Sequence, residues 1–279
     1  MDWKGREQSQ NVEDRRGSSS GGGGGKVPGI LGIIVVLVGA YYGVDLSGLV
    51  GTPSIGTGST QTSQLKPEEE AELNELARVV LADTEKAWGG YFKQIGRTYT
   101  PTTLVLYNGG TSTACGMGQS AMGPFYCPGD QKVYLDLDFY RDMQTKLNSA
   151  SDAAFAYVIA HEVGHHVQNL LGILPQVHRM QQQVGRKEAN VLSVKLELQA
   201  DCYAGIWGHY AVNNNIFKAE DITKAMLAAE SVGDDRLQKE GQGYVVPDSF
   251  THGSSEQRMA WLKRGLDSGD INQCNTFGN

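Results

Sequence analysis

The stretch VIAHEVGHHV, at residues 158–167, constrains the fold of this chain more than any other segment. On a helix, His161 and His165 lie one above the other on the same face, because they are four residues apart. Two imidazoles so placed can bind one Zn²⁺ at about 2.0–2.1 Å each, and Glu162 then stands beside the metal, where it can accept a proton from a polarised water. Taken alone, the pattern also fits a helix whose histidines are ordinary surface or core residues.

A catalytic zinc site needs a third protein ligand and an open fourth position. The metzincin pattern would supply a glycine and a further histidine from the same segment, but Gln168 and Leu171 occupy those places, which excludes that class. The later sequence ELQAD offers Glu197 and Asp201, four residues apart in apolar surroundings. Buried carboxylates are costly unless they are paired or bound to a metal. We therefore expect Glu197 to be the third ligand and Asp201 to accept a hydrogen bond from a histidine ligand.

These motifs carry a family resemblance. The pair HExxH and ExxAD resembles the gluzincin metallopeptidases, including the membrane-associated heat-shock and CAAX-prenyl types. The segments CGMGQSAMGPFYCP, VIAHEVGHHVQ, ELQADCYAG and PDSFTHGSSEQR, together with an amino-terminal apolar stretch, resemble the bacterial neutral zinc metallopeptidases along nearly the whole chain. This resemblance implies a zincin-like fold and a bound zinc ion, and it names no substrate.

The resemblance also implies roles for residues outside the two motifs. His252 matches a histidine that stabilises the oxyanion in gluzincins, and Arg258 matches a downstream arginine that braces Asp201 or another acid. Related enzymes hold the substrate backbone along an edge strand before the zinc helix. Here QSAMGPF takes that place, which points to Ser120, Ala121 and Met122, although Pro124 departs from a regular strand.

The remaining histidines have no metal-binding role in this interpretation. His166 points about 100° away from His165 on a helix of 3.6 residues per turn. His178 and His209 lack the spacing of metal ligands.

The first third of the chain divides into segments of distinct composition. Residues 1–26 are polar and end in a glycine tract, which predicts a disordered cytoplasmic tail. Residues 27–45 contain the uncharged stretch Val27–Val44, which predicts a transmembrane anchor. Residues 46–66, rich in Gly, Ser and Thr, predict a flexible linker, and residues 67–279 the metallopeptidase domain.

The charge distribution around the anchor predicts its orientation. Lysine and arginine residues precede the stretch, and none follows it until Lys66. The positive-inside rule then places the amino terminus in the cytoplasm and the domain in the periplasm or outside the cell, attached to a bacterial inner membrane by one span. Cleavage after a signal peptide is the alternative, because Val38-Gly39-Ala40 loosely fits a cleavage site.

The domain has the pattern of an α+β fold. A helix begins at Pro67, and TTLVLYNG and QKVYLDL are typical of strands. Several helices then follow from Asp152, the expected N-cap of the zinc helix, with Gly172 as its stop. A small strand region followed by many helices is an α+β arrangement.

Composition limits the partners and the compartment. A net charge of −7 without a basic cluster excludes nucleic acid as an expected partner. The 4 cysteines suit two disulfides in an oxidising compartment, with buried free thiols as the alternative. Of the three possible pairings we expect Cys115–Cys127, around the substrate edge, and Cys202–Cys274, which would hold the carboxy-terminal tail to the Glu197 helix.

The sequence thus predicts a zinc-dependent endopeptidase that hydrolyses protein or peptide substrates on the extracytoplasmic side of the membrane. Two alternatives stay open. A zincin-like scaffold could bind or chaperone envelope proteins with little hydrolysis, although Glu162 would then have no purpose. A zinc amidase acting on cell-wall peptide is the second, since the linker and the extracytoplasmic side permit it and no residue excludes it.

Overall fold

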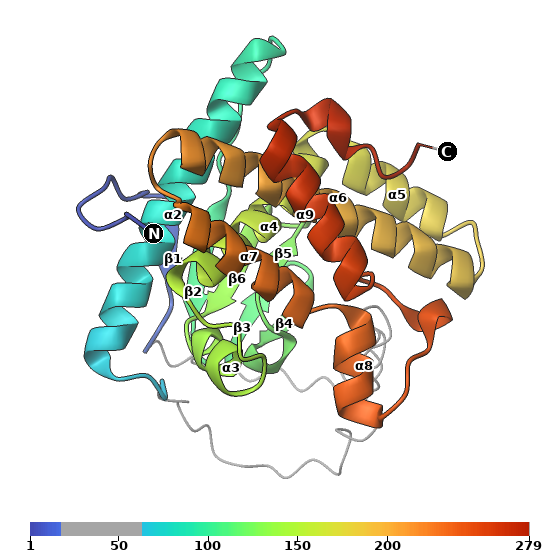
Figure 1. The fold of residues 1–279 in the computed structure, drawn as a ribbon, viewed down its shortest axis with the longest axis horizontal. Helices are drawn as coiled ribbons and strands as arrows, with labels where there is room; N and C mark the ends of the chain where they lie inside the picture. Colours follow the sequence, from blue (N-terminus) through green and yellow to red (C-terminus); the bar gives the residue numbers. More distant parts are fainter. Residues whose placement is uncertain (18–62, 279) are drawn as a thin grey trace.

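The computed structural model describes residues 1–17 and 63–278, which form a mixed α+β fold (Figure 1). This confirms the α+β arrangement predicted for the domain. The strands are β1 (Val12–Asp14), β2 (Thr103–Tyr107), β3 (Gly110–Thr113), β4 (Gly116–Gln119), β5 (Phe125–Cys127) and β6 (Lys132–Asp136). The helices are α2 (Pro67–Gln94), α3 (Phe139–Thr145), α4 (Asp152–Leu170), α5 (Ile173–Gln181), α6 (Arg186–Asn213), α7 (Ala219–Ser231), α8 (Asp234–Gln242) and α9 (Ser255–Ser268).

Four of the strands form one sheet in the order β1-β2-β6-β5. β1, β2 and β6 run parallel, and β5 pairs with β6 in the antiparallel direction. The central strands are apolar along most of their length, as expected of strands covered on both faces. Leu104, Leu106 and Leu135 are fully buried. β3 and β4 form a separate antiparallel ribbon.

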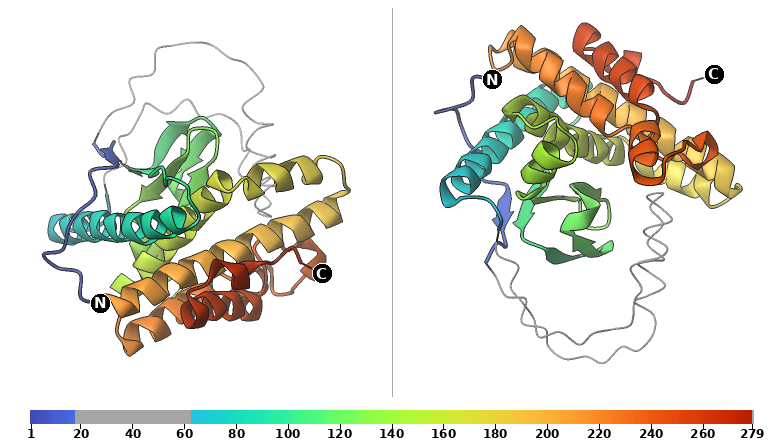
Figure 2. Two further views of the ribbon diagram at one scale, coloured as in Figure 1. Left: turned by 90° about the horizontal axis from the view of Figure 1, so that it is seen from above. Right: turned by 60° about the horizontal axis from the view of Figure 1, so that its bottom comes forward.

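The helices lie in two layers beside the sheet (Figure 2). α2 and α4 lie next to the strands, and α6 and α9 form the outer layer with α7. α4 is therefore the central helix, and it packs against α2, α6 and α7 as well as β5 and β6. Ala160, Val163 and Val167 on α4 are at most 1% exposed.

Two glycines, Gly205 and Gly265, allow α6 and α9 to cross at a short distance. A Cβ on Gly265 would stand 2.0 Å from the carbonyl oxygen of Cys202, and one on Gly205 would stand 2.2 Å from that of Leu262. Real Cβ atoms do not approach so closely, so any larger residue would push the helices apart. This crossing brings the beginning of α9 close to the metal-site half of α6.

The amino-terminal residues correct one prediction. Residues 1–17 are not a disordered tail, because β1 pairs with β2 and Trp3 is 2% exposed in the main core. The polar composition of residues 1–26 and the glycine tract at their end predicted disorder for the whole segment, including residues 1–17. The flexible linker was predicted to extend to residue 66, but the folded domain already includes Ser63 and Leu65. Ser63 Oγ donates a 2.7 Å hydrogen bond to Asp138 Oδ1, and Leu65 is buried.

The predicted anchor at residues 27–45 lies outside the described residues. Within the ranges 1–17 and 63–278, none of the helices combines the length and apolar character that a membrane span requires. The helix boundaries agree closely with the sequence patterns at Pro67 and Gly172. The N-cap of α4 is Ser151, whose side chain accepts a hydrogen bond from the Ala154 N–H, and the predicted N-cap Asp152 is the first helical residue.

Candidate metal centre

α4 and α6 bring three ligand groups together. His161 Nε2 lies 3.0 Å from Glu197 Oε2, and His165 Nε2 lies 3.4 Å from Glu197 Oε1. One ligand atom from each of the three residues lies within 4.8 Å of the other two. In the described part of the chain this is the one cluster of His, Cys, Asp and Glu that meets that criterion.

The three residues fit a zinc ion. Ligands at 2.0–2.1 Å from a tetrahedral metal are about 3.3 Å from one another, which is close to the two separations measured here. Two imidazoles and one carboxylate are also the donor set of known catalytic zinc sites with an open fourth position. His161, His165 and Glu197 are therefore suited to hold the metal.

The other nitrogen of each histidine ligand has a hydrogen-bond partner. His161 Nδ1 lies 2.8 Å from Asp201 Oδ1, and His165 Nδ1 lies 2.9 Å from Gln168 Oε1. Such partners fix the tautomer and the ring orientation, which leaves Nε2 of each ring available to a metal ion. Gln168 in turn donates from Nε2 to the Leu196 carbonyl oxygen at 2.8 Å. Sequence reasoning missed Gln168, although its position three residues after His165 places it on the same helical face.

Arg258 holds Asp201, the hydrogen-bond partner of His161, in place. Its Nε donates to Asp201 Oδ2 at 2.8 Å, and its Nη2 donates to Asp201 Oδ1 at 3.0 Å. The Tyr157 hydroxyl donates to the same Oδ1 at 2.6 Å. Burial alone would raise the pKa of Asp201, but Arg258 and His161 lower it to about 2, so the carboxylate is held ionised. The predicted bracing of Asp201 by Arg258 agrees with this geometry.

Glu162 is buried in the metal-site region. It is 8% exposed, and burial raises its pKa although His161 and His165 act in the opposite direction. A raised pKa makes a carboxylate a better proton acceptor near neutral pH. Its position next to His161 on α4 is the one that the sequence pattern predicts for a general base.

His252 approaches the centre from the loop before α9. Its Nδ1 lies 3.1 Å from Asp234 Oδ1, and its charge interacts with that of Glu197. Burial would lower the pKa of His252, but Asp234 and Glu197 raise it. The backbone N–H groups of Thr251, His252 and Gly253 all donate to Asp234 Oδ2, at 2.7–3.1 Å. Asp234, at the first position of α8, was not predicted, since 18 residues separate it from His252.

Two of the other histidines have hydrogen-bond partners outside the cluster of His161, His165 and Glu197. His166 Nδ1 lies 3.0 Å from the Tyr126 hydroxyl, and its Nε2 lies 2.7 Å from the Thr100 carbonyl oxygen. His209 Nδ1 lies 2.9 Å from the Leu266 carbonyl oxygen. Burial lowers the pKa of His178.

The predicted substrate edge is not a strand at its predicted residues. Ser120–Met122 form a 3₁₀ turn, in which Ser120 Oγ is bonded to the Gly109 carbonyl oxygen and to Asp136. One of the two edge strands of the sheet is β5, which follows Pro124 directly and contacts α4. Gly123 and Pro124 end the turn, so regular strand geometry begins a few residues later than predicted.

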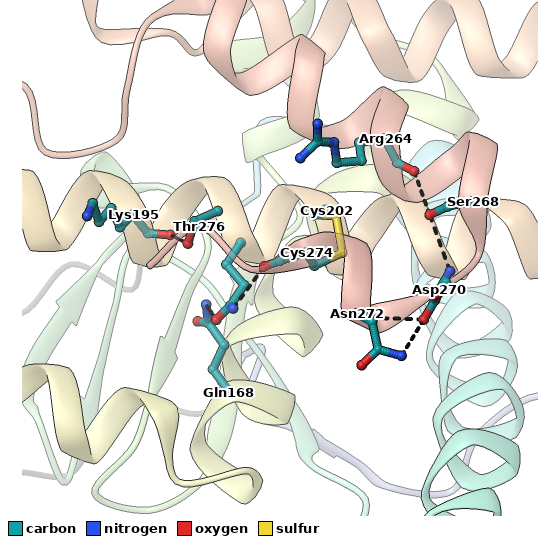
Figure 3. The surroundings of a disulfide bond; sticks show 10 residues. Gln168, Lys195, Cys202, Arg264, Ser268, Asp270, Asn272, Cys274 and Thr276 are labelled. Atoms are coloured by element: carbon teal, nitrogen blue, oxygen red, sulfur yellow. Dashed lines mark hydrogen bonds between the residues drawn. A yellow bond between two sulfur atoms is a disulfide. The ribbon is translucent and has the colours of Figure 1, made fainter. Parts of the chain in front are cut away.

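Both predicted disulfides are present. Cys115–Cys127 joins the β3–β4 ribbon to β5, and Cys202–Cys274 joins α6 to the 3₁₀ turn Ile271–Cys274, with Cα–Cα distances of 5.8 and 5.6 Å. Figure 3 shows the second bridge with two further contacts of the carboxy-terminal tail to the ligand helix. Gln199 Nε2 donates to the Cys274 carbonyl oxygen at 3.0 Å, and Thr276 Oγ1 donates to that of Lys195 at 2.6 Å.

Known proteins are similar to this sequence over most or all of its length, as two examples show. "Uncharacterized protein YpfJ" of Escherichia coli strain K12 is 54% identical over 287 residues, covering 100% of this chain and 99% of the relative. "Uncharacterized protein Rv2575" of Mycobacterium tuberculosis is 40% identical over 222 residues, covering 74% of this chain and 73% of the relative. No solved structure matches, so the zincin-like fold class stays a prediction. A family model described as "Putative neutral zinc metallopeptidase" matches residues 1–277, and the chain belongs to this family.

Proposed function

We propose that this protein is a zinc-dependent endopeptidase that acts on protein or peptide substrates outside the cytoplasm. The proposal depends mainly on one observation: His161, His165 and Glu197 each place a possible ligand atom within 4.8 Å of the other two. Glu162 follows His161 directly on the same helix. Membership of a zinc metallopeptidase family also supports a zinc-dependent hydrolase.

The chain's own groups suit peptide hydrolysis. A bound zinc ion would lower the pKa of water and polarise the scissile carbonyl group. Glu162 accepts the proton of the attacking water and then donates it to the departing amine, a role that its buried, poorly solvated carboxylate favours. His252, held by Asp234 and with a raised pKa, donates a hydrogen bond to the oxygen on which negative charge develops.

The disulfides support the extracytoplasmic location. All four cysteines of the sequence are paired, and such bonds persist in oxidising compartments. The uncharged stretch at residues 27–44 is compatible with attachment to a bacterial membrane, but we do not propose that it crosses the membrane once. We do not propose the cytoplasmic amino terminus expected from the charge distribution, because residues 1–17 belong to the same sheet as the domain.

The test compares the full-length protein with its Glu162→Gln variant. Zinc content is measured together with cleavage of a peptide library, an unfolded protein and cell-wall peptide. We expect the variant to keep its zinc while peptide cleavage falls by about 10²–10⁴-fold. The exposed-site variant Glu220→Gln is the control and should match the parent. Cleavage of cell-wall peptide alone would replace the endopeptidase by an amidase, and equal cleavage by parent and Glu162→Gln would overturn the mechanism.

A further inference from the structure

We infer that residues 1–17 are an integral part of the catalytic domain and lie in the same compartment as residues 63–278. The two ranges therefore lie on the same side of any membrane to which the protein is attached. This inference concerns the topology of the chain and holds whether or not the proposed peptidase activity is correct.

The first support is the backbone pairing of β1. The Leu104 N–H donates to the Asn11 carbonyl oxygen at 2.9 Å, and the Arg15 N–H donates to that of Leu106 at 2.8 Å. β2 lies between β1 and β6, and its residues Leu104–Leu106 are fully buried. Without β1, one side of this buried strand would have unpaired N–H and C=O groups, which is costly.

Side chains before β1 add contacts to α4, to α2 and to the residues just after α6. Trp3 Nε1 donates to Asp152 Oδ2 at 2.7 Å, at the first residue of the zinc helix α4. Arg6 Nη2 donates to the Asn215 carbonyl oxygen at 3.2 Å, just beyond the end of α6. Ser9 Oγ donates to Glu85 Oε1 on α2 at 2.7 Å. The segment thus contacts the first residue of α4, which carries His161 and His165, and the chain just after α6, which carries Glu197.

The basic residues of this segment have partners in the folded molecule. Arg16 is paired with Asp14 at 2.6 Å and with Glu70 of α2 at 2.9 Å. Arg15 Nη1 donates to Thr111 Oγ1 at 2.9 Å and also contacts the Ser112 carbonyl oxygen. The charge bias that predicted a cytoplasmic tail therefore has a second explanation, since these arginines bind the domain.

A single crossing between Gly17 and Ser63 would place these partners on opposite sides of the bilayer. Two helical crossings need about 40 apolar residues, whereas the uncharged stretch Val27–Val44 provides about half that number. Gly17 and Ser63, the ends of the two described ranges, are therefore expected on the same side of the membrane.

The decisive experiment is thiol labelling of the full chain in its own membrane. Gln10→Cys and Lys224→Cys, both at exposed positions, are made separately and treated with a membrane-impermeant maleimide before and after lysis. For each variant, labelling before lysis is divided by labelling after lysis. We expect this ratio to be the same at residue 10 and at residue 224. If one thiol is labelled in intact spheroplasts and the other only after lysis, the inference is overturned.

A matched pair of variants tests whether β1 pairing is part of the native fold. Arg15→Pro and Arg15→Ala both remove the side chain, but only proline removes the N–H that bonds to Leu106. We expect Arg15→Pro to lower the Tm of the full-length protein by about 5 °C more than Arg15→Ala. Equal Tm values for the two variants would show that β1 is dispensable and would remove the basis of the inference.

Discussion

Gly164, inside the HEVGH motif, lies directly against Ala200 of the other ligand helix. A Cβ at Gly164 would stand 3.0 Å from the Ala200 carbonyl oxygen and 3.3 Å from Tyr203 Cβ. The two helices that carry His161 and Glu197 can approach this closely only because residue 164 has no side chain.

We therefore expect Gly164→Val to lower both stability and zinc affinity. Overpacking of this kind costs about 1–3 kcal/mol of unfolding free energy, and it would separate α4 from α6 at the ligands. Denaturant unfolding and zinc titration of the purified protein measure the two effects. Gly90→Ala is the control, because a Cβ there has no neighbour within 4 Å, and alanine in a helix stabilises by roughly 0.5–1 kcal/mol. Unchanged zinc affinity in Gly164→Val would contradict the argument.

Gln168 should control zinc affinity without touching the metal. Gln168→Leu keeps the approximate size of the side chain but removes the oxygen bonded to His165 Nδ1. Loss of such a partner weakens metal binding by about 10–100-fold, which competition with a chelator can measure. Gln168→Glu retains an acceptor and should bind zinc more tightly than Gln168→Leu. Equal affinities in the two variants would show that the hydrogen bond does not orient the ligand.

His252 should act in chemistry and not in metal binding. Its ring is held by Asp234, and the cluster of possible ligands does not include it. We expect His252→Ala to retain zinc while kcat for peptide cleavage falls by about 10²–10³-fold, as for other oxyanion donors. Zinc analysis and steady-state kinetics on the same preparation separate the two roles. Loss of zinc in His252→Ala would instead make His252 part of the metal site.

The cluster of His161, His165 and Glu197 could be predicted from the sequence because the spacing within each motif follows from helical geometry. His161 and His165 are four residues apart, as are Glu197 and Asp201, so local periodicity was enough. Asp234 could not be predicted in this way, because it reaches His252 through a contact between α8 and the loop before α9. Residues 1–17 were misjudged for a similar reason, since their order depends on a pairing with β2 about 90 residues away.

The two disulfides should differ in their effect on the metal site. Cys202 follows Asp201 directly on the ligand helix, whereas Cys115–Cys127 lies in the strand region. We expect the double variant Cys202→Ser/Cys274→Ser to lose stability by about 2–4 kcal/mol and to retain zinc less well. Cys115→Ser/Cys127→Ser should lose stability with a smaller change in zinc retention. Zinc release during denaturant titration of both variants decides this, and an equal loss would refute the link between the tail and the ligand helix.

Asp83 should make stability depend on pH in the unusual direction for a carboxylate. It is 8% exposed on α2, and burial raises its pKa to about 6 although Trp207 Nε1 donates a hydrogen bond to it at 2.9 Å. Since the folded pKa exceeds the unfolded value of 3.8, this stabilising contribution is present below about pH 4 and is lost as the pH rises through 6. Asp83→Asn keeps an acceptor for Trp207 and removes the charge. At pH 8 we expect the variant to exceed the parent by roughly 1–3 kcal/mol in unfolding free energy, with the difference shrinking toward pH 4. Denaturant unfolding at pH 4, 6 and 8 measures the trend, and a parent that is the more stable of the two at pH 8 would show that the ionised carboxylate stabilises the fold.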